Sequence, residues 1–226
     1  MRLQEEGSWG QERAKFFEQW AALDPLAAWE AARSEDLRCV TGASVAVLKG
    51  WAAGNPRLAG EWLQGLPKTS ERTLLMDGLL AGWAQAEPNA SQARAEWLST
   101  QENLPGLERV LAGELARWYI RGDGAGLAAW LEQREWSPET METTALRTVS
   151  AICAAEAYSA EAMGAWLSGL SAGRVRDSMI AAWAQENARV DAAACREWVK
   201  RIHNEPLRTR VSRRIDAVDT GTDETL

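Results

Sequence analysis

The stretch that decides the fold covers residues 56–84 and reads PRLAGEWLQGLPKTSERTLLMDGLLAGWA. Its first part spaces Leu58 and Trp62 as neighbours on one helix face, and its second part spaces Leu79 and Trp83 in the same way. A proline lies between the two parts, and proline disfavours a helical conformation in the residue before it. The stretch therefore predicts two helices joined by a turn, a helical hairpin.

Two series of tryptophans repeat along the chain at the spacing of this hairpin. The first series recurs every 32 to 36 residues and comprises Trp29, Trp62, Trp97, Trp130, Trp166 and Trp198. The second series precedes turn signals and comprises Trp20, Trp51, Trp83, Trp118 and Trp183, with Cys153 in the remaining slot. A fixed period of this length is typical of stacked repeats. We interpret these tryptophans as core rather than as a ligand platform, because each would bury roughly 150–250 Å² beside small residues; Trp9 and Trp136 fall outside both series, and their role stays open.

The repeat predicts an all-α fold, a right-handed α-solenoid of about six helical hairpins preceded by one helix over residues 9–22. The hairpins are expected at residues 25–52, 56–84, 89–120, 124–156, 159–185 and 190–218. Asp24, Asn55, Ser137 and Asp191 are placed to cap helix N-termini. Residues 1–218 are predicted to form a single domain, and residues 219–226 a disordered polar tail.

A hairpin period of 31–36 residues with prolines at the junctions resembles the tetratricopeptide repeat and related α-solenoids. The form Trp-Ala-x-x-Asp-Pro followed by Ala-x-x-Trp-Leu is similar to a class of bacterial helical-hairpin repeats, over about residues 20–217. Neither resemblance carries catalytic residues. The 21 arginines against 4 lysines also favour a bacterial source with a GC-rich genome.

Nothing in the sequence is arranged as a reaction centre. Cys39, Cys153 and Cys195 are too widely spaced for a zinc motif or a disulfide framework. His203 is the only histidine, and Cys195 lies two helical turns away, too far for a nucleophile–base pair within one helix. We therefore expect no enzyme activity, no metal, no cofactor and no small-molecule substrate. No apolar run is long enough for a membrane span and no secretory signal pattern is present, so a cytoplasmic protein without membrane contact is expected.

Although the net charge of the chain is −7, residues 196–214 form a basic segment that contains seven basic residues and two acidic ones. The candidate residues for an anionic partner are Arg201, Arg208, Arg210, Arg213 and Arg214. The same segment has a narrow apolar stripe of Leu207, Val211 and Ile215, which is also typical of a terminal cap. Arginine recurs early in the second helices, at Arg38, Arg72, Arg109, Arg147, Arg176 and Arg210; ion pairs between neighbouring repeats are favoured over a repeating anionic ligand.

The first helix carries Phe16 and Phe17 with no partner helix before it, so either residues 1–10 fold back over it or this edge meets another subunit. Trp9, Phe16 and Phe17 are therefore the candidate hydrophobic partner edge. The repeat architecture predicts a protein–protein interaction scaffold or adaptor that binds a peptide or subunit. The alternative is a nucleic-acid-associated accessory subunit of a larger complex, acting through the arginine-rich last hairpin.

Overall fold

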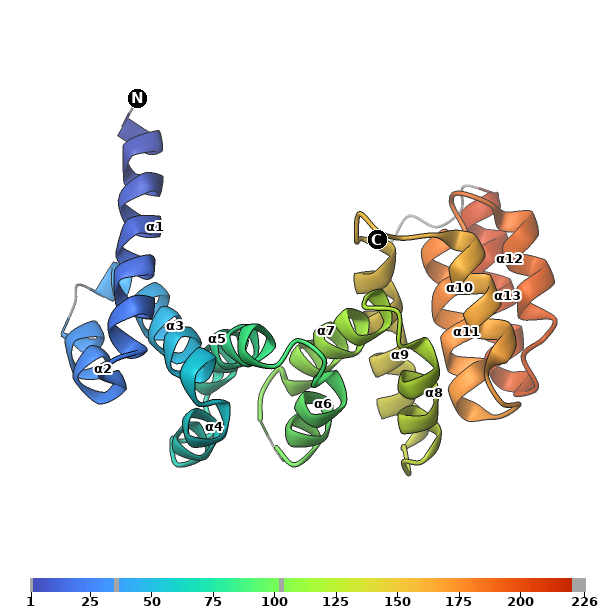
Figure 1. Ribbon diagram of the computed structural model, residues 1–226. Coiled ribbons are helices and arrows are strands. Elements are labelled where there is room, and N and C mark those ends of the chain that lie inside the picture. The colour runs from blue at the N-terminus through green and yellow to red at the C-terminus, as the bar shows by residue number, and fades with distance from the viewer. Residues whose placement is uncertain (1, 35–36, 102–103, 221–226) are drawn as a thin grey trace. The chain divides into compact units, whose positions relative to one another are not determined.

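The computed structural model describes the backbone of residues 2–34, 37–101 and 104–220, and the side chains of residues 10–34, 42–101 and 104–220. In this part of the chain there are thirteen helices and no strand, which confirms the all-α class (Figure 1). The helices are α1 (Arg2–Ala21), α2 (Pro25–Arg33), α3 (Leu37–Gly54), α4 (Pro56–Gln64), α5 (Ser70–Ala86), α6 (Ser91–Ser99), α7 (Leu107–Ile120), α8 (Gly124–Glu132), α9 (Pro138–Cys153), α10 (Ala160–Gly169), α11 (Arg174–Asn187), α12 (Ala192–Val199) and α13 (Glu205–Asp219).

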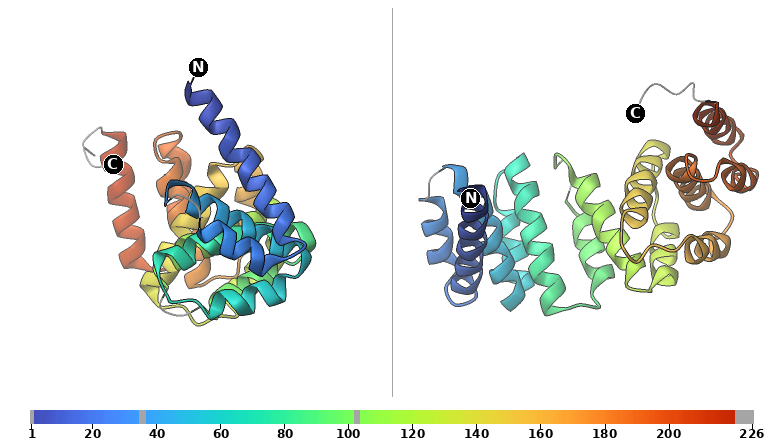
Figure 2. Two further views of the ribbon diagram at one scale, coloured as in Figure 1. Left: turned by 90° about the vertical axis from the view of Figure 1, so that its left-hand side faces the viewer. Right: turned by 90° about the horizontal axis from the view of Figure 1, so that it is seen from above.

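The helices fall into two compact units, residues 1–110 and 111–226. In the first unit, α3 lies between α1 and α5 and also contacts α2 and α4 (Figure 1). In the second unit, α11 lies between α9 and α13 and also contacts α10 and α12 (Figure 2). The single domain expected over residues 1–218 stays a prediction.

Helix lengths alternate along the chain after α1. Each range expected to be a hairpin contains one helix of 8–10 residues followed by one of 14–18 residues. The capping predictions are confirmed, because the side chains of Asp24, Asn55, Ser137 and Asp191 each accept a hydrogen bond from a backbone N–H in the first turn. These local signals fix where the helices begin.

Both ends of the helical region differ from the sequence expectation. α1 begins at Arg2 rather than near residue 9, because Leu3, Gln4 and Glu5 are good helix formers and the helix continues through Gly7 and Gly10. Asp219 and Thr220 belong to the end of α13 and its cap rather than to a tail. The rest of the expected tail, residues 221–226, lies outside the described residues.

The tryptophans mark the junctions between successive helix pairs. Of the twelve whose side chains are described, Trp29, Trp118, Trp130 and Trp183 are buried, and the other eight, Trp136 among them, are half-buried. The tryptophan of a long helix meets that of the next short helix, with ring centroids 5.3–6.3 Å apart, in the pairs Trp51–Trp62, Trp83–Trp97, Trp118–Trp130 and Trp183–Trp198. The repeated tryptophans therefore pack on one another within the helical layers, as the core interpretation expects, although most keep one edge in water.

Cys153 occupies the one slot of the second series that lacks tryptophan. The ring of Trp166 packs instead on Tyr119, with centroids 5.0 Å apart. Asn187 Nδ2 lies 3.8 Å from Cys153 Sγ, and Trp183 Nε1 donates to the Tyr158 hydroxyl at 3.1 Å. Burial, and then the charges of the neighbouring phenol and thiol, raises the pKa of Tyr119. Both tyrosines of the sequence thus lie around the position where a tryptophan is missing.

Glycines bring the long helices of the first unit into backbone contact. A Cβ at Gly50 of α3 would clash with the Glu18 carbonyl of α1, and a Cβ at Gly82 of α5 would clash with the Lys49 carbonyl of α3. Gly78 has the same relation to the Val45 carbonyl. The α1–α3–α5 layer is therefore closer than helices with side chains at these positions allow.

Candidate functional site

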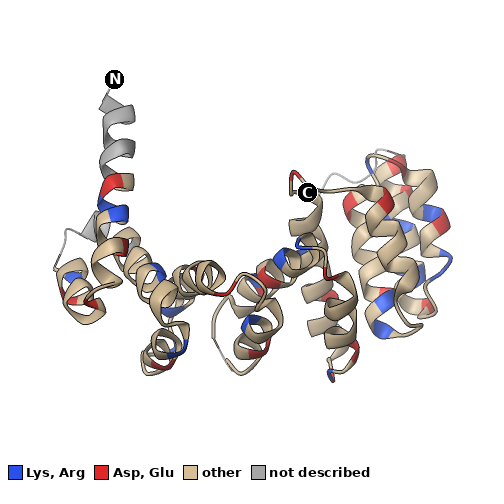
Figure 3. Ribbon diagram, viewed as in Figure 1, with Lys and Arg blue, Asp and Glu red and all other residues tan. Residues whose placement is uncertain are grey.

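The last helix of the chain, α13, is apolar on one side only. Leu207, Val211 and Ile215 are buried on one side of α13, as the apolar stripe predicts. Basic and acidic positions are interspersed on the remaining surface of α12 and α13 (Figure 3).

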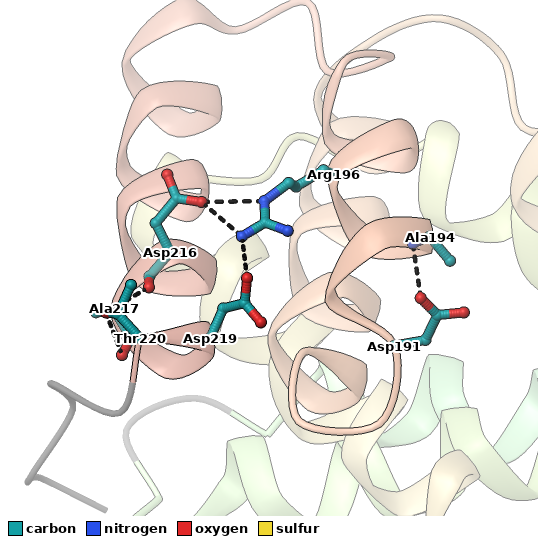
Figure 4. A network of polar contacts seen from close by, with 7 residues as sticks. All are labelled: Asp191, Ala194, Arg196, Asp216, Ala217, Asp219 and Thr220. Carbon is teal, nitrogen blue, oxygen red and sulfur yellow. Dashed lines mark hydrogen bonds and ion pairs between the residues drawn. The ribbon is translucent and has the colours of Figure 1, made fainter.

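Acidic neighbours compensate much of the basic charge in this segment. The Arg196 guanidinium bridges α12 to α13, lying 3.0 Å from Asp216 Oδ1 and 2.7 Å from Asp219 Oδ2 (Figure 4). These two carboxylates, Asp219 first, raise the pKa of Arg196. Lys200 forms an ion pair with Glu197. This part of the segment therefore offers little free charge to a polyanion.

The five candidate arginines do not form one cluster. Arg201 lies over the Trp198 ring, with its Cζ 4.1 Å from the centroid, and Arg208 donates to the Ile202 carbonyl at 3.0 Å. Arg210 forms an ion pair with Glu142, and Arg214 donates to Gln185 Oε1 at 3.0 Å. Within the described residues, Arg213 has no hydrogen-bond or ion-pair partner.

A groove lies beside the ion pair between Arg210 of α13 and Glu142 of α9. It has a volume of about 190 Å³ and is lined by Glu142, Thr143 and Leu146 of α9, Ser178, Ala181, Ala182 and Gln185 of α11, and Leu207 and Arg210 of α13. We call it the α11 groove. Three of its four α11 residues have small side chains, and the Arg210–Glu142 pair joins α13 to α9 beside them. Leu146 leaves 37% of its surface exposed beside this pair.

The sequence identified only Arg210 and Leu207 among the residues of the α11 groove. Glu142 and Arg210 are 68 residues apart, and no local pattern joins them. The one sequence feature that points to this groove is the recurring arginine of the second helices, because Arg210 is its last member.

The arginine series is engaged in mixed ways. Arg109 lies 2.9 Å from Asp77 of the preceding long helix, so here the expected ion pair between neighbours is present. Arg72 and Arg176 instead reach polar groups in the loop within the following helix pair, Gln101 Oε1 at 2.7 Å and His203 Nδ1 at 2.8 Å. Arg38 lies outside the residues whose side chains are described.

The expected hydrophobic edge on α1 is smaller than the sequence suggests. Phe17 is only 3% exposed and therefore belongs to the core, whereas Phe16 is 57% exposed. The backbone of residues 2–10 continues α1, so it does not fold back over the helix. Trp9 lies outside the residues whose side chains are described.

The two cysteines with described side chains are poor nucleophiles. Burial, and then the charge of Asp191, raises the pKa of Cys195 to about 11. Burial also raises the pKa of Cys153. His203 is exposed, with Nδ1 3.8 Å from Asp177 Oδ1, and Cys39 lies outside the described side chains.

The Cys195 thiol should make the protein less stable in alkaline solution. Its pKa rises from 9.0 to about 11 on folding, so between these pH values the unfolded chain loses a proton that the folded chain keeps. The free energy of unfolding should therefore fall as pH rises from 9 to 11. Urea unfolding at several pH values measures this slope. Cys195→Ala should show a shallower fall, and equal slopes for the two proteins would contradict the assignment.

No group of three or more His, Cys, Asp or Glu side chains in the described part of the chain is arranged to hold a metal ion. None of the helices in that part is both long and apolar enough to span a membrane. Comparisons with known proteins find no matching family model, no matching curated protein and no matching solved structure.

Proposed function

We propose that this chain is a non-enzymatic protein–protein interaction scaffold built as a right-handed, tetratricopeptide-like α-solenoid of six helical hairpins. The recurring contact between a long-helix tryptophan and the next short-helix tryptophan supports the repeat. It places equivalent side chains at successive junctions, as stacked hairpins require.

The observation that carries the proposal is the α11 groove. Three long helices contribute to it, three of its four α11 residues have small side chains, and Leu146 offers a partly exposed apolar contact in its lining. An extended or helical protein segment fits such a surface, with an apolar residue on Leu146 and a charged residue at its edge.

The ion pair across the α11 groove can exchange partners at low cost. The side chains of Arg210 and Glu142 are 62% and 37% exposed, and an exposed pair contributes only about 0–1 kcal/mol. A carboxylate from a bound segment can therefore replace Glu142 at Arg210, and a basic group can replace Arg210 at Glu142.

Affinity capture of the tagged full chain from its own cells, with and without nuclease, tests this function. A protein partner retained after nuclease should bind Leu146→Asp about tenfold less, because a charge enters the apolar contact. Arg57→Glu is the control, since Arg57 lies on the exposed surface of α4, in the other unit, where it forms an ion pair with Glu61. Equal retention by Leu146→Asp and the wild type would contradict binding in the groove, and turnover by the purified protein would contradict a non-enzymatic scaffold.

The alternative function, a nucleic-acid-associated accessory subunit, rests on Arg213 and on Arg214, which among the described residues has a hydrogen bond only to the neutral Gln185. It requires recovery that is lost with nuclease and an affinity that falls steeply with salt. The salt slope should flatten when Arg210, Arg213 and Arg214 are all replaced by alanine. Cytoplasmic localisation and a bacterial source remain predictions from the sequence.

A further inference from the structure

A second cavity lies in the first unit, between α2 and the start of α5. It has a volume of about 290 Å³ and is lined by Trp29, Arg33, Leu66, Pro67, Thr69, Glu71, Arg72 and Leu75. We call it the Arg72 crevice. Its walls are partly apolar, and two guanidinium groups and one carboxylate are its charged groups.

Among the described residues, no carboxylate contacts the guanidinium of Arg72. The residue is only 5% exposed, and its Nη atoms donate to the carbonyls of Gln64 and Leu66 and to Gln101 Oε1. These acceptors are neutral, and within the described residues the Nε of Arg72 has no partner. The burial lowers the pKa of Arg72. A buried charge without a counter-ion is costly, so an anion in the crevice is favoured.

A carboxylate already sits at the mouth of the Arg72 crevice. Arg33 Nη1 lies 3.0 Å from Glu71 Oε1, with the two side chains 50% and 56% exposed, so the pair is easily displaced. Arg33 also lies over the Trp29 ring, with its Cζ 5.6 Å from the centroid. A carboxylate from outside can therefore take the place of Glu71 while its aliphatic stem packs on Trp29.

The same construction recurs in the second unit. Arg134 follows Trp130 by four residues, as Arg33 follows Trp29, and its Cζ lies 4.0 Å from the Trp130 ring centroid. Arg134 and Arg174 line a depression of about 620 Å³ at the start of α11, and the buried Nε of Arg134 has no partner. Glu132 and Glu135 also line this depression, so the two units share the arginine beside the short-helix tryptophan but not a net positive charge.

We propose that the Arg72 crevice binds the carboxylate side chain of an acidic protein segment. Arg33 and Arg72 supply the positive charge, and Trp29, Leu66 and Leu75 contact the stem and an apolar neighbour of that side chain. A carboxylate fits better than a phosphate, because Glu71 lines the crevice and would repel a dianion. The inference rests on the proposed function for a protein segment as the source of the carboxylate. It concerns a different site from the α11 groove.

Nuclear magnetic resonance of the ¹⁵N-labelled full chain tests the proposal at Arg72 itself. The probe is the N-acetylated, C-amidated peptide Ala-Ala-Glu-Leu-Ala, with its Glu→Gln analogue and inorganic phosphate as the other arms. Arg72→Lys assigns the Nε–H signal of Arg72. The Glu peptide should shift this signal saturably, and the Gln analogue and phosphate should not. No shift with the Glu peptide, or a larger shift with phosphate, overturns the proposal.

Three variants test the geometry without removing Arg72. Arg33→Ala should weaken binding of the Glu peptide about tenfold through loss of a charge-assisted hydrogen bond. Glu71→Gln should tighten it about threefold by freeing Arg33. Arg57→Ala is the control and should leave the affinity unchanged. Opposite results for the first two variants contradict the assigned roles.

Glu102 follows Gln101, the partner of Arg72, in the sequence and lies outside the described residues. The variant Glu102→Gln therefore tests whether this carboxylate is the counter-ion of Arg72. An affinity equal to that of the wild type supports the proposal, whereas binding tenfold tighter means that the chain supplies its own carboxylate and overturns it. Because the titration needs only this chain and a peptide, it is independent of partner loss in Leu146→Asp, and the two proposals can fail separately.

Discussion

Gly82→Ala is expected to destabilise the protein by about 3 kcal/mol, near the upper end of overpacking effects. The added Cβ would overlap the Lys49 carbonyl and approach Ala52 and Ala53, all on α3. A backbone carbonyl cannot rotate away as a flexible side chain can, so α3 and α5 must separate and lose packing along their contact. Urea unfolding followed by circular dichroism measures the change in the free energy of unfolding.

Gly42→Ala is the matched control for this prediction. Gly42 also lies within a helix, α3, but a Cβ there meets nothing within 4 Å among the described residues outside its own helix backbone. Alanine should therefore stabilise the protein by about 0.5–1 kcal/mol, because it is the better helix former. If both variants change stability in the same direction, the close approach at Gly82 is not the cause.

Trp183→Ala should cost about 3–5 kcal/mol, the range for removing a large aromatic ring from a core. Trp183 is only 6% exposed, packs on Trp198 with ring centroids 5.7 Å apart, and donates to the Tyr158 hydroxyl. Its removal empties the junction between α11 and α12 and leaves Tyr158 without this donor. The midpoint of urea unfolding should fall accordingly.

Two further variants separate the ring of Trp183 from its hydrogen bond and from hydrophobicity in general. Trp183→Phe keeps an aromatic ring and should lose only about 1 kcal/mol, the contribution of a typical hydrogen bond. Val190→Ala removes an apolar side chain that is largely exposed, and it should change stability by less than about 0.5 kcal/mol. A loss at Val190 comparable to that at Trp183 would argue against the tryptophan junction as the source of stability.

The helices could be predicted because their determinants are local. Caps such as Asn55 and prolines such as Pro56 act within a few residues, and the expected hairpins end within about a turn of the ends of the long helices. Whether the tryptophans are buried could be predicted only in part, because a ring at a junction keeps an edge in water when its neighbours are small.

The candidate sites depend on tertiary contacts and could not be predicted in the same way. Phe16 and Phe17 are adjacent in sequence, and only the position of α3 decides which of them is buried. Arginine is usually exposed, so nothing in the sequence distinguishes the buried Arg72 from the exposed Arg109. The α11 groove depends on a contact between residues that are distant in sequence.

The position of the two tyrosines gives the protein a natural local reporter. Thirteen tryptophans are spread over the whole sequence, so indole fluorescence averages over many junctions. Tyr119 and Tyr158, in contrast, both lie around Cys153, and burial raises the pKa of each. The ultraviolet absorbance change on phenolate formation, or the spectrum of ring-labelled tyrosine, therefore reports the opening of this one junction separately from the unfolding of the rest.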